Sequence, residues 1–70
     1  MITKIGLVAG DIWNYLDGHG GCDQIKNIIN GVEKQGDIVL MSIGWLAREG
    51  HILLEREDEG YTVKLSRNDQ

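Results

Sequence analysis

The spacing of apolar residues changes at Gly50, and this change constrains the fold more than any other feature of the sequence. Before Gly50, apolar residues recur three or four positions apart, which is typical of one face of an amphipathic helix. After Gly50, apolar and polar residues alternate, which indicates strands. The chain is therefore predicted to place several helices before a single β-hairpin.

Three helices are expected before Gly50. The first runs from about Lys4 to Asp17, and its apolar stripe consists of Ile5, Val8, Ala9, Ile12 and Leu16. The second starts after Asp23 as its N-cap and ends at Asn30-Gly31. The third runs from Asp37, again as N-cap, to Glu49, with Gly50 as its stop.

Two strands are expected after Gly50, at about residues 52–56 and 61–65, joined by a turn at residues 57–60. A one-residue strand near Cys22 also fits the pattern. Two helices joined by a short turn and followed by a two-stranded ribbon form a winged helix-turn-helix. The predicted fold is thus α+β, with three helices, a C-terminal two-stranded wing and one domain over residues 1–70.

Two motifs carry a resemblance to a known family. The first is Ala9-Gly10-Asp11-Ile12-Trp13, in the first predicted helix, and the second is Ile43-Gly44-Trp45-Leu46-Ala47-Arg48-Glu49, in the third. With these motifs, residues 5–65 resemble a family of small bacterial and archaeal winged helix-turn-helix proteins of unknown function. The resemblance implies the fold and no particular activity, because fold alone does not specify function.

The third helix has two contrasting faces. Val39, Ile43, Leu46 and Ala47 form the expected inward stripe, with Leu40 at its margin. The expected outward face consists of Ile38, Met41, Trp45 and Arg48, with Ser42 at its edge. A helix that reads base edges would present Arg, Lys, Asn, Gln or Ser there, whereas this face is mostly apolar. We therefore interpret it as a surface that binds a protein partner or a second copy of the chain.

Trp45 leaves an alternative open. If the wing or the C-terminal tail folds over its ring, Trp45 belongs to the core and the proposed surface loses its largest side chain.

The charge balance disfavours a nucleic-acid partner without excluding it. Eleven acids and seven basic residues give a net charge of −4, and residues 55–59 carry four acids and one base at the predicted wing tip. Affinity for a duplex comes mainly from cations that neutralise phosphates. If DNA binds, the candidate contacts are Lys26, Lys34, Arg48 and Lys64. A small DNA-binding regulator is therefore the alternative function.

The sequence offers no strong catalytic or metal site. His19, Cys22, Asp23 and His51 are the available ligands for a transition metal, but a structural zinc site usually needs four ligands with paired Cys or His spacings. The glycine-rich loop at residues 17–23 lacks the lysine of a phosphate-binding loop, and Cys22 has no evident activating triad. We expect no metal, no cofactor, no small-molecule substrate and no enzymatic activity.

The apolar stretch at residues 5–10 is too short for a signal peptide or a membrane span, so we expect a cytoplasmic protein without a membrane partner. The single cysteine excludes an intrachain disulfide.

Overall fold

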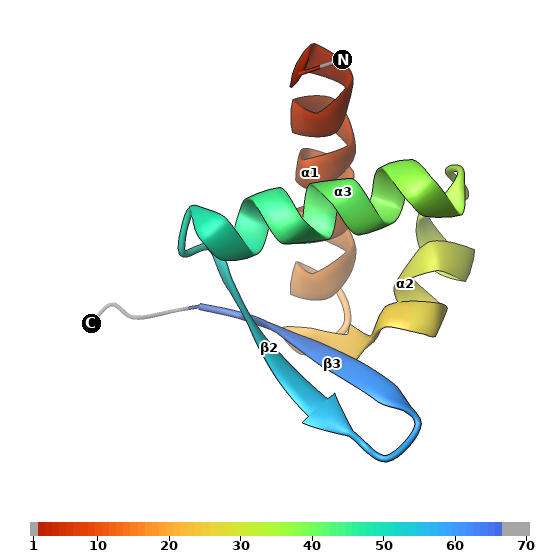
Figure 1. Cartoon of the computed structure of the whole chain (residues 1–70), viewed down its shortest axis with the longest axis vertical. Coiled ribbons are helices and arrows are strands. Elements are labelled where there is room, and N and C mark those ends of the chain that lie inside the picture. Colours follow the sequence, from red (N-terminus) through yellow and green to blue (C-terminus); the bar gives the residue numbers. More distant parts are fainter. Residues whose placement is uncertain (1, 67–70) are drawn as a thin grey trace.

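The computed structural model describes residues 2–66. The elements in chain order are α1 (Ile2–Asp17), β1 (Cys22–Gln24), α2 (Ile25–Val32), α3 (Gly36–Arg48), β2 (Ile52–Glu57) and β3 (Gly60–Leu65). Three helices with a β2–β3 wing confirm the predicted α+β winged helix-turn-helix (Figure 1).

The sheet has three strands, so the predicted two-stranded wing is only part of it: the third strand, β1, lies where a one-residue strand was expected near Cys22. The antiparallel strand order is β1-β3-β2, and Cys22 lies opposite Lys64 in the β1–β3 register. The Leu65 amide also donates to the Gly21 carbonyl at 2.8 Å, which extends the pairing by one residue. The short strand therefore occupies an edge of β3 that the hairpin alone would leave open.

Neither of the two predicted N-cap residues is an N-cap in the structure. Asp23 belongs to β1, and the N-cap of α2 is Gln24. Asp37 lies inside the first turn of α3, whose N-cap is Gln35. The Asp37 carboxylate accepts from the Ile38 amide at 2.7 Å, so it still satisfies an amide in the first turn of the helix.

The C-terminal end of α3 agrees with the prediction, whereas that of α2 does not. Gly50 takes a left-handed φ of 81°, and the His51 amide donates to the Leu46 carbonyl at 2.9 Å, as in a Schellman motif. By contrast, α2 continues past the predicted stop at Asn30-Gly31 to Val32, and its C-cap Glu33 has a left-handed φ of 56°.

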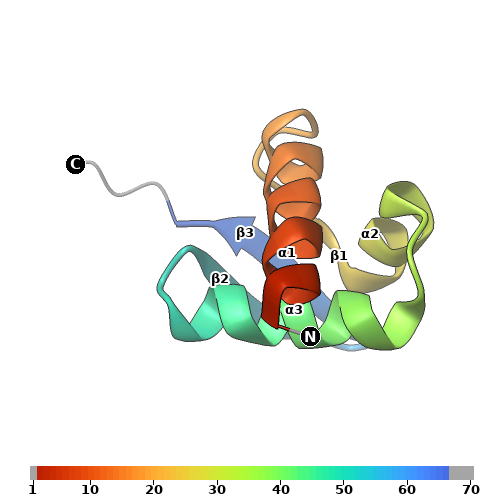
Figure 2. The ribbon, with the colours of Figure 1, turned by 90° about the horizontal axis from the view of Figure 1, so that it is seen from above.

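The core lies where α3 crosses α1 and where the base of the wing covers both (Figure 1). Seen from above, α2 lies beside α1 and near the N-terminal end of α3 (Figure 2). The fully buried large side chains are Ile12, Leu16, Ile28, Val39, Ile52 and Val63.

The buried stripe of α3 is wider than predicted. Ile38 is only 5% exposed, so its assignment to the outward face is wrong, and Ser42 at the supposed edge is fully buried. The Ser42 hydroxyl donates to the Ile38 carbonyl at 2.7 Å and lies 3.3 Å from the Ile5 carbonyl. Because this hydroxyl finds acceptors, a polar residue can face α1 at the helix crossing without an unpaired group.

Candidate binding surface on α3 and the wing

The outward side of α3 presents large apolar side chains. Leu40 is 50% exposed and Met41 is 46% exposed, although each lies within a turn of fully buried Val39. Arg48 extends from the last turn of the same helix, and its side chain is largely exposed. Of the predicted partner-binding residues, the structure thus places Met41, Trp45 and Arg48 at the surface and Ile38 in the core.

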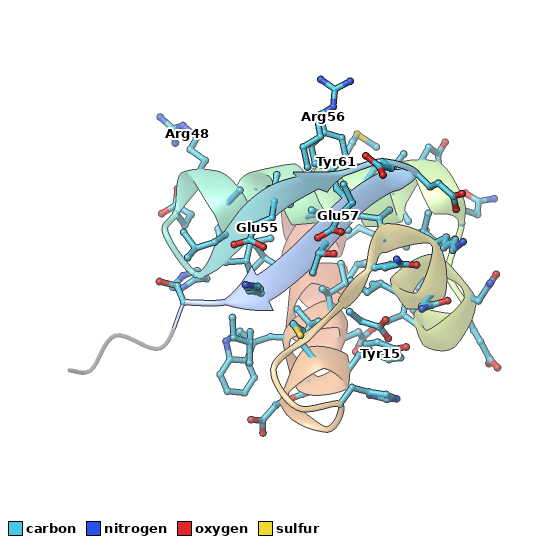
Figure 3. The ribbon with its side chains drawn as sticks, turned by 90° about the horizontal axis from the view of Figure 1, so that it is seen from below. Tyr15, Arg48, Glu55, Arg56, Glu57 and Tyr61 are labelled. Atoms are coloured by element: carbon cyan, nitrogen blue, oxygen red, sulfur yellow. The ribbon has the colours of Figure 1, made fainter. Side chains whose placement is uncertain are left out.

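The wing adds side chains that the sequence interpretation omitted. Along β2, alternate residues share a face: Ile52 is buried against the helices, whereas Leu54 and Arg56 lie closer to the hairpin tip and are exposed. Tyr61 lies directly opposite Arg56 in the register, and it is exposed as well. The side chains of Arg48, Arg56 and Tyr61 point to the same side of the molecule (Figure 3).

We call the combined surface the α3–wing surface. It consists of Leu40, Met41, Arg48, Leu54, Arg56 and Tyr61. The strand alternation that places Leu54 and Arg56 on one face is visible in the sequence, but it does not show that this face adjoins the exposed side of α3.

The acids of the hairpin do not all face the α3–wing surface. Glu55 and Glu57 project from the opposite side of the ribbon to Arg56 and Tyr61 (Figure 3). On that opposite face, Glu55 pairs with Lys64 at 3.1 Å and Glu57 accepts from the Thr62 hydroxyl at 3.1 Å. The negative charge read from residues 55–59 is therefore divided between the two faces of the wing.

An apolar groove of about 340 Å³ lies beside this surface, between α2, α3 and the hairpin. Its walls include Ile25 and Ile29 from α2, Leu40 from α3 and Tyr61 from β3, with Lys26 and Glu59 also among its lining residues. Sequence reasoning did not find this groove, because it brings together three segments whose apolar residues each fit a separate amphipathic pattern.

The four predicted nucleic-acid contacts do not form one patch. Lys34 lies 3.9 Å from the Asp11 carboxylate on α1, and Lys64 is paired on the outer face of the sheet. Lys26 lines the groove, whereas Arg48 extends from the last turn of α3 and lies 3.4 Å from the neighbouring Glu49 carboxylate.

Trp45 lies on the α1 side of α3 and is 41% exposed, so the wing does not bury it. Its ring is tilted against His51, with 6.3 Å between the ring centroids. Together with Trp13 and Gly10, these two residues line a second groove of about 290 Å³. The motifs at residues 9–13 and 43–49 therefore meet at this second groove.

A polar cluster fixes the junction of α1, β1 and α2. The Tyr15 hydroxyl donates to the Asp23 carboxylate at 2.8 Å, and the Asn27 amide donates to the same carboxylate at 2.9 Å. The His19 ring stacks on Tyr15, with 3.9 Å between centroids, and its Nδ1 lies 2.6 Å from the Tyr15 carbonyl. We call these four residues the polar clasp.

The clasp shifts the pKa values of both acidic groups in it. The hydrogen bond from Asn27 is the main cause that lowers the pKa of Asp23, with further lowering from Tyr15, the Gln24 amide and His19. The hydrogen bond to Asp23 raises the pKa of Tyr15, because ionisation would remove the donated proton.

The four candidate metal ligands belong to different parts of the structure. His19 and Asp23 belong to the clasp, Cys22 is exposed on the sheet, and His51 lies against Trp45. Within residues 2–66, no group of three His, Cys, Asp or Glu side chains is placed to hold a metal ion. Over the same residues, no helix has the length and apolar character needed to cross a membrane.

Comparison with known proteins agrees with this architecture. MJ1608, an uncharacterized protein of Methanocaldococcus jannaschii, is 40% identical over 66 residues, which cover 93% of this chain and 94% of MJ1608. The solution NMR structure of BT2368 from Bacteroides thetaiotaomicron superposes with a TM-score of 0.77 at 24% identity, covering 90% of this chain and 76% of that one. The profile of the winged helix-turn-helix domain DUF2582 matches residues 1–65. The chain therefore belongs to this winged helix-turn-helix family of unknown function.

Proposed function

We propose that the protein is a non-enzymatic binding module that docks a protein partner, or a second copy of itself, through the α3–wing surface. The observation that carries this proposal is the exposure of large apolar side chains from two elements on one side of the molecule. Leu40 and Met41 come from α3, and Leu54 and Tyr61 come from the wing. Contiguous apolar surface bordered by charges is typical of protein contacts.

The chemistry of α3 favours protein over DNA. In a winged helix that reads DNA, the corresponding helix enters the major groove and contacts base edges through hydrogen bonds. Here the exposed residues in the middle of α3 are Leu40, Met41, Gly44 and Trp45, and only the Trp45 indole, on the α1 side of the helix, can donate a side-chain hydrogen bond. These side chains suit a desolvated protein interface, where Met is enriched.

Site-specific photo-crosslinking in the native cell tests the proposal. A photoreactive phenylalanine analogue at position 41 is expected to yield a covalent adduct with a protein, or with a second copy of the chain. The matched control carries the same analogue at position 7, because Leu7 is equally apolar and more exposed but lies on α1. Adducts with nucleic acid only, or equal adducts at both positions, would refute protein docking at the α3–wing surface.

DNA binding is the second candidate function, and one observation favours it: Arg48 and Arg56 point to the same side from α3 and the wing (Figure 3). With Lys26, these residues allow about three phosphate contacts, so log K should fall with log salt at a slope no steeper than about −3. Fluorescence anisotropy with a labelled duplex measures this slope. Nanomolar binding of one particular sequence at physiological salt would favour DNA recognition over protein recognition.

A further inference from the structure

We infer that two copies of the chain associate through the open edge of β2, which pairs antiparallel with β2 of the second copy. The pairing joins the two sheets into one, in which the two β2 strands lie side by side at the centre and each β1 lies at an outer edge. The site is the backbone edge of β2, so the inference goes beyond the α3–wing surface and does not depend on the proposed function.

The outer edge of β2 carries backbone groups that are free within residues 2–66. Strand β2 forms one edge of the sheet (Figure 1), and at its base the Ser66 amide donates to the His51 carbonyl at 2.9 Å. Because hydrogen-bonded positions alternate in an antiparallel ladder, residues 51, 53, 55 and 57 direct their amides and carbonyls toward β3. Those of Ile52, Leu54 and Arg56 therefore point away from β3, and no other element of the described chain donates to them or accepts from them.

The conformation of β2 leaves this edge available for another strand. Its six residues pair one to one with β3 without a bulge, and the chain contains no proline. Leu53 is 57% exposed on one face of the strand, and Leu54 is 43% exposed on the other. The glutamates at positions 55 and 57 are bonded to Lys64 and Thr62 of β3, so they are held on their own hairpin. An extended backbone matches such an edge, because its donors and acceptors alternate at the same spacing.

The sequence of β2 favours a second copy of the same strand as the occupant. The outward residues 52, 54 and 56 are symmetric about Leu54, so pairing centred there satisfies the outward groups of both strands with about six hydrogen bonds. In this register Leu54 lies opposite itself, Ile52 opposite Arg56, and Leu53 opposite Glu55, so no like charges face each other. Pairing centred on Glu55 would oppose two carboxylates, and pairing centred on Leu53 would place Arg56 beyond the end of the other β2.

Disulfide trapping tests the association and its register together. Leu53→Cys and Glu55→Cys are made separately in a Cys22→Ser background, mixed in equal amounts and oxidised gently. In the proposed register, these positions face each other as a non-hydrogen-bonded pair with Cα atoms about 4.5 Å apart, which a disulfide can span. The mixed disulfide, identified by its mass, should exceed each symmetric disulfide by about tenfold or more, because pairing raises the effective concentration of the two thiols.

The matched control is Leu7→Cys in the same background. Leu7 is 69% exposed and lies on α1, so its disulfide reports random collision of folded chains. The mixed β2 disulfide should form about tenfold faster than the Leu7→Cys disulfide.

Sedimentation equilibrium tests the association of the natural chain. Its apparent mass should rise with protein concentration toward twice the 7.8 kDa of one chain. Leu54→Lys places two like charges opposite each other at the symmetry axis and should remain monomeric, whereas Leu7→Lys should associate like the natural chain. In the natural chain, exchange of the outward Leu54 amide with solvent should slow as the concentration rises.

The inference is wrong if the natural chain stays monomeric up to about 1 mM, or if Leu54→Lys associates as strongly as the natural chain. It is also wrong if a symmetric β2 disulfide forms as readily as the mixed one, because the register would then differ. Association without slower exchange of the Leu54 amide would place the contact on another surface and would equally refute the pairing. If Leu54→Lys does not fold, the trapping experiment decides the question without that variant.

Discussion

The polar clasp and the α3–wing surface lie in different parts of the molecule. Side chains of the clasp have hydrogen-bond partners within the chain, whereas those of the α3–wing surface are exposed to solvent. In the clasp, Tyr15, His19, Asp23 and Asn27 satisfy one another or the backbone within hydrogen-bonding distance. On the α3–wing surface, apolar side chains are left in water, and Arg56 forms no ion pair within residues 2–66.

This difference separates residues that hold the fold from residues available for binding. The clasp ties α1 to β1 and α2, so its contacts are complete within the chain. The exposed parts of Leu40, Met41 and Leu54 do not stabilise the isolated chain, because apolar area that stays in water does not contribute to the free energy of folding. We expect changes in the clasp to alter stability and changes on the α3–wing surface to alter binding.

The largest predicted contrast lies within α3 itself. Leu46 is 3% exposed, so Leu46→Ala should lower the free energy of unfolding by about 2–5 kcal/mol through lost burial and a residual cavity. Leu40→Ala removes the same atoms from the outward side and should cost less than about 1 kcal/mol. Urea melts of the two variants measure both values. Equal losses would mean that the two faces of α3 are not distinct.

Two helical glycines give the next contrast. A Cβ at Gly31 would overlap the Tyr15 ring, so Gly31→Ala should displace Tyr15 and destabilise the chain by about 1–3 kcal/mol. A Cβ at Gly44 meets nothing within 4 Å, and Gly44→Ala should stabilise α3 by about 0.5–1 kcal/mol.

Thermal melts measure whether each glycine substitution stabilises or destabilises the chain. In a Tyr15→Ala background, the penalty at Gly31 should largely disappear, because the ring that causes the overlap is absent. If the penalty persists there, overlap with the Tyr15 ring is not the cause of the destabilisation.

The smallest predicted stability effect is a dependence on pH that originates in the clasp. The lowered pKa of Asp23 stabilises the fold above its ordinary value of 3.8, and this contribution is lost as the pH falls through the lowered pKa. The raised pKa of Tyr15 stabilises the fold below 10.0, and this contribution is lost as the pH rises above that value.

Asp23→Asn should flatten the acidic limb of a plot of unfolding free energy against pH, and Tyr15→Phe should flatten the alkaline limb. Asp37→Asn is the matched control for the acidic limb, because Asp37 accepts from a backbone amide at the start of α3 and lies outside the clasp. The clasp assignment fails if Asp37→Asn changes the acidic limb as much as Asp23→Asn does.

The elements with a strong apolar period could be predicted from sequence. The stripe of α1, the inward residues of α3 and the alternation of the wing each repeat often enough to fix their type. Strand β1 was predicted only as a single residue near Cys22, because residues 22–24 have no alternating pattern and pair with residues far along the chain. Its existence depends on the open edge of β3 rather than on local preference.

The binding surface was predicted only in part for a similar reason. Met41 and Arg48 follow from helical phase alone, but Ile38 belongs to the core cluster, because the buried face of α3 also includes Ile38 and Ser42 and is wider than the predicted stripe. The alternation along β2 places Arg56 on the same face as Ile52 and Leu54, but the sequence does not show that Tyr61 lies opposite it. The apolar period of a helix or strand predicts which residues share one face of that element. It does not predict which elements lie side by side to form the α3–wing surface.

The central claim is that the α3–wing surface exists for binding and not for folding. The most direct test places the photoreactive residue at position 48 and compares the natural surface with the Leu40→Gln, Met41→Gln double variant. We predict that the double substitution lowers the yield of the protein adduct by about tenfold or more, while the free energy of unfolding changes by less than about 0.5 kcal/mol. An unchanged adduct yield, or a variant that unfolds, would contradict the claim.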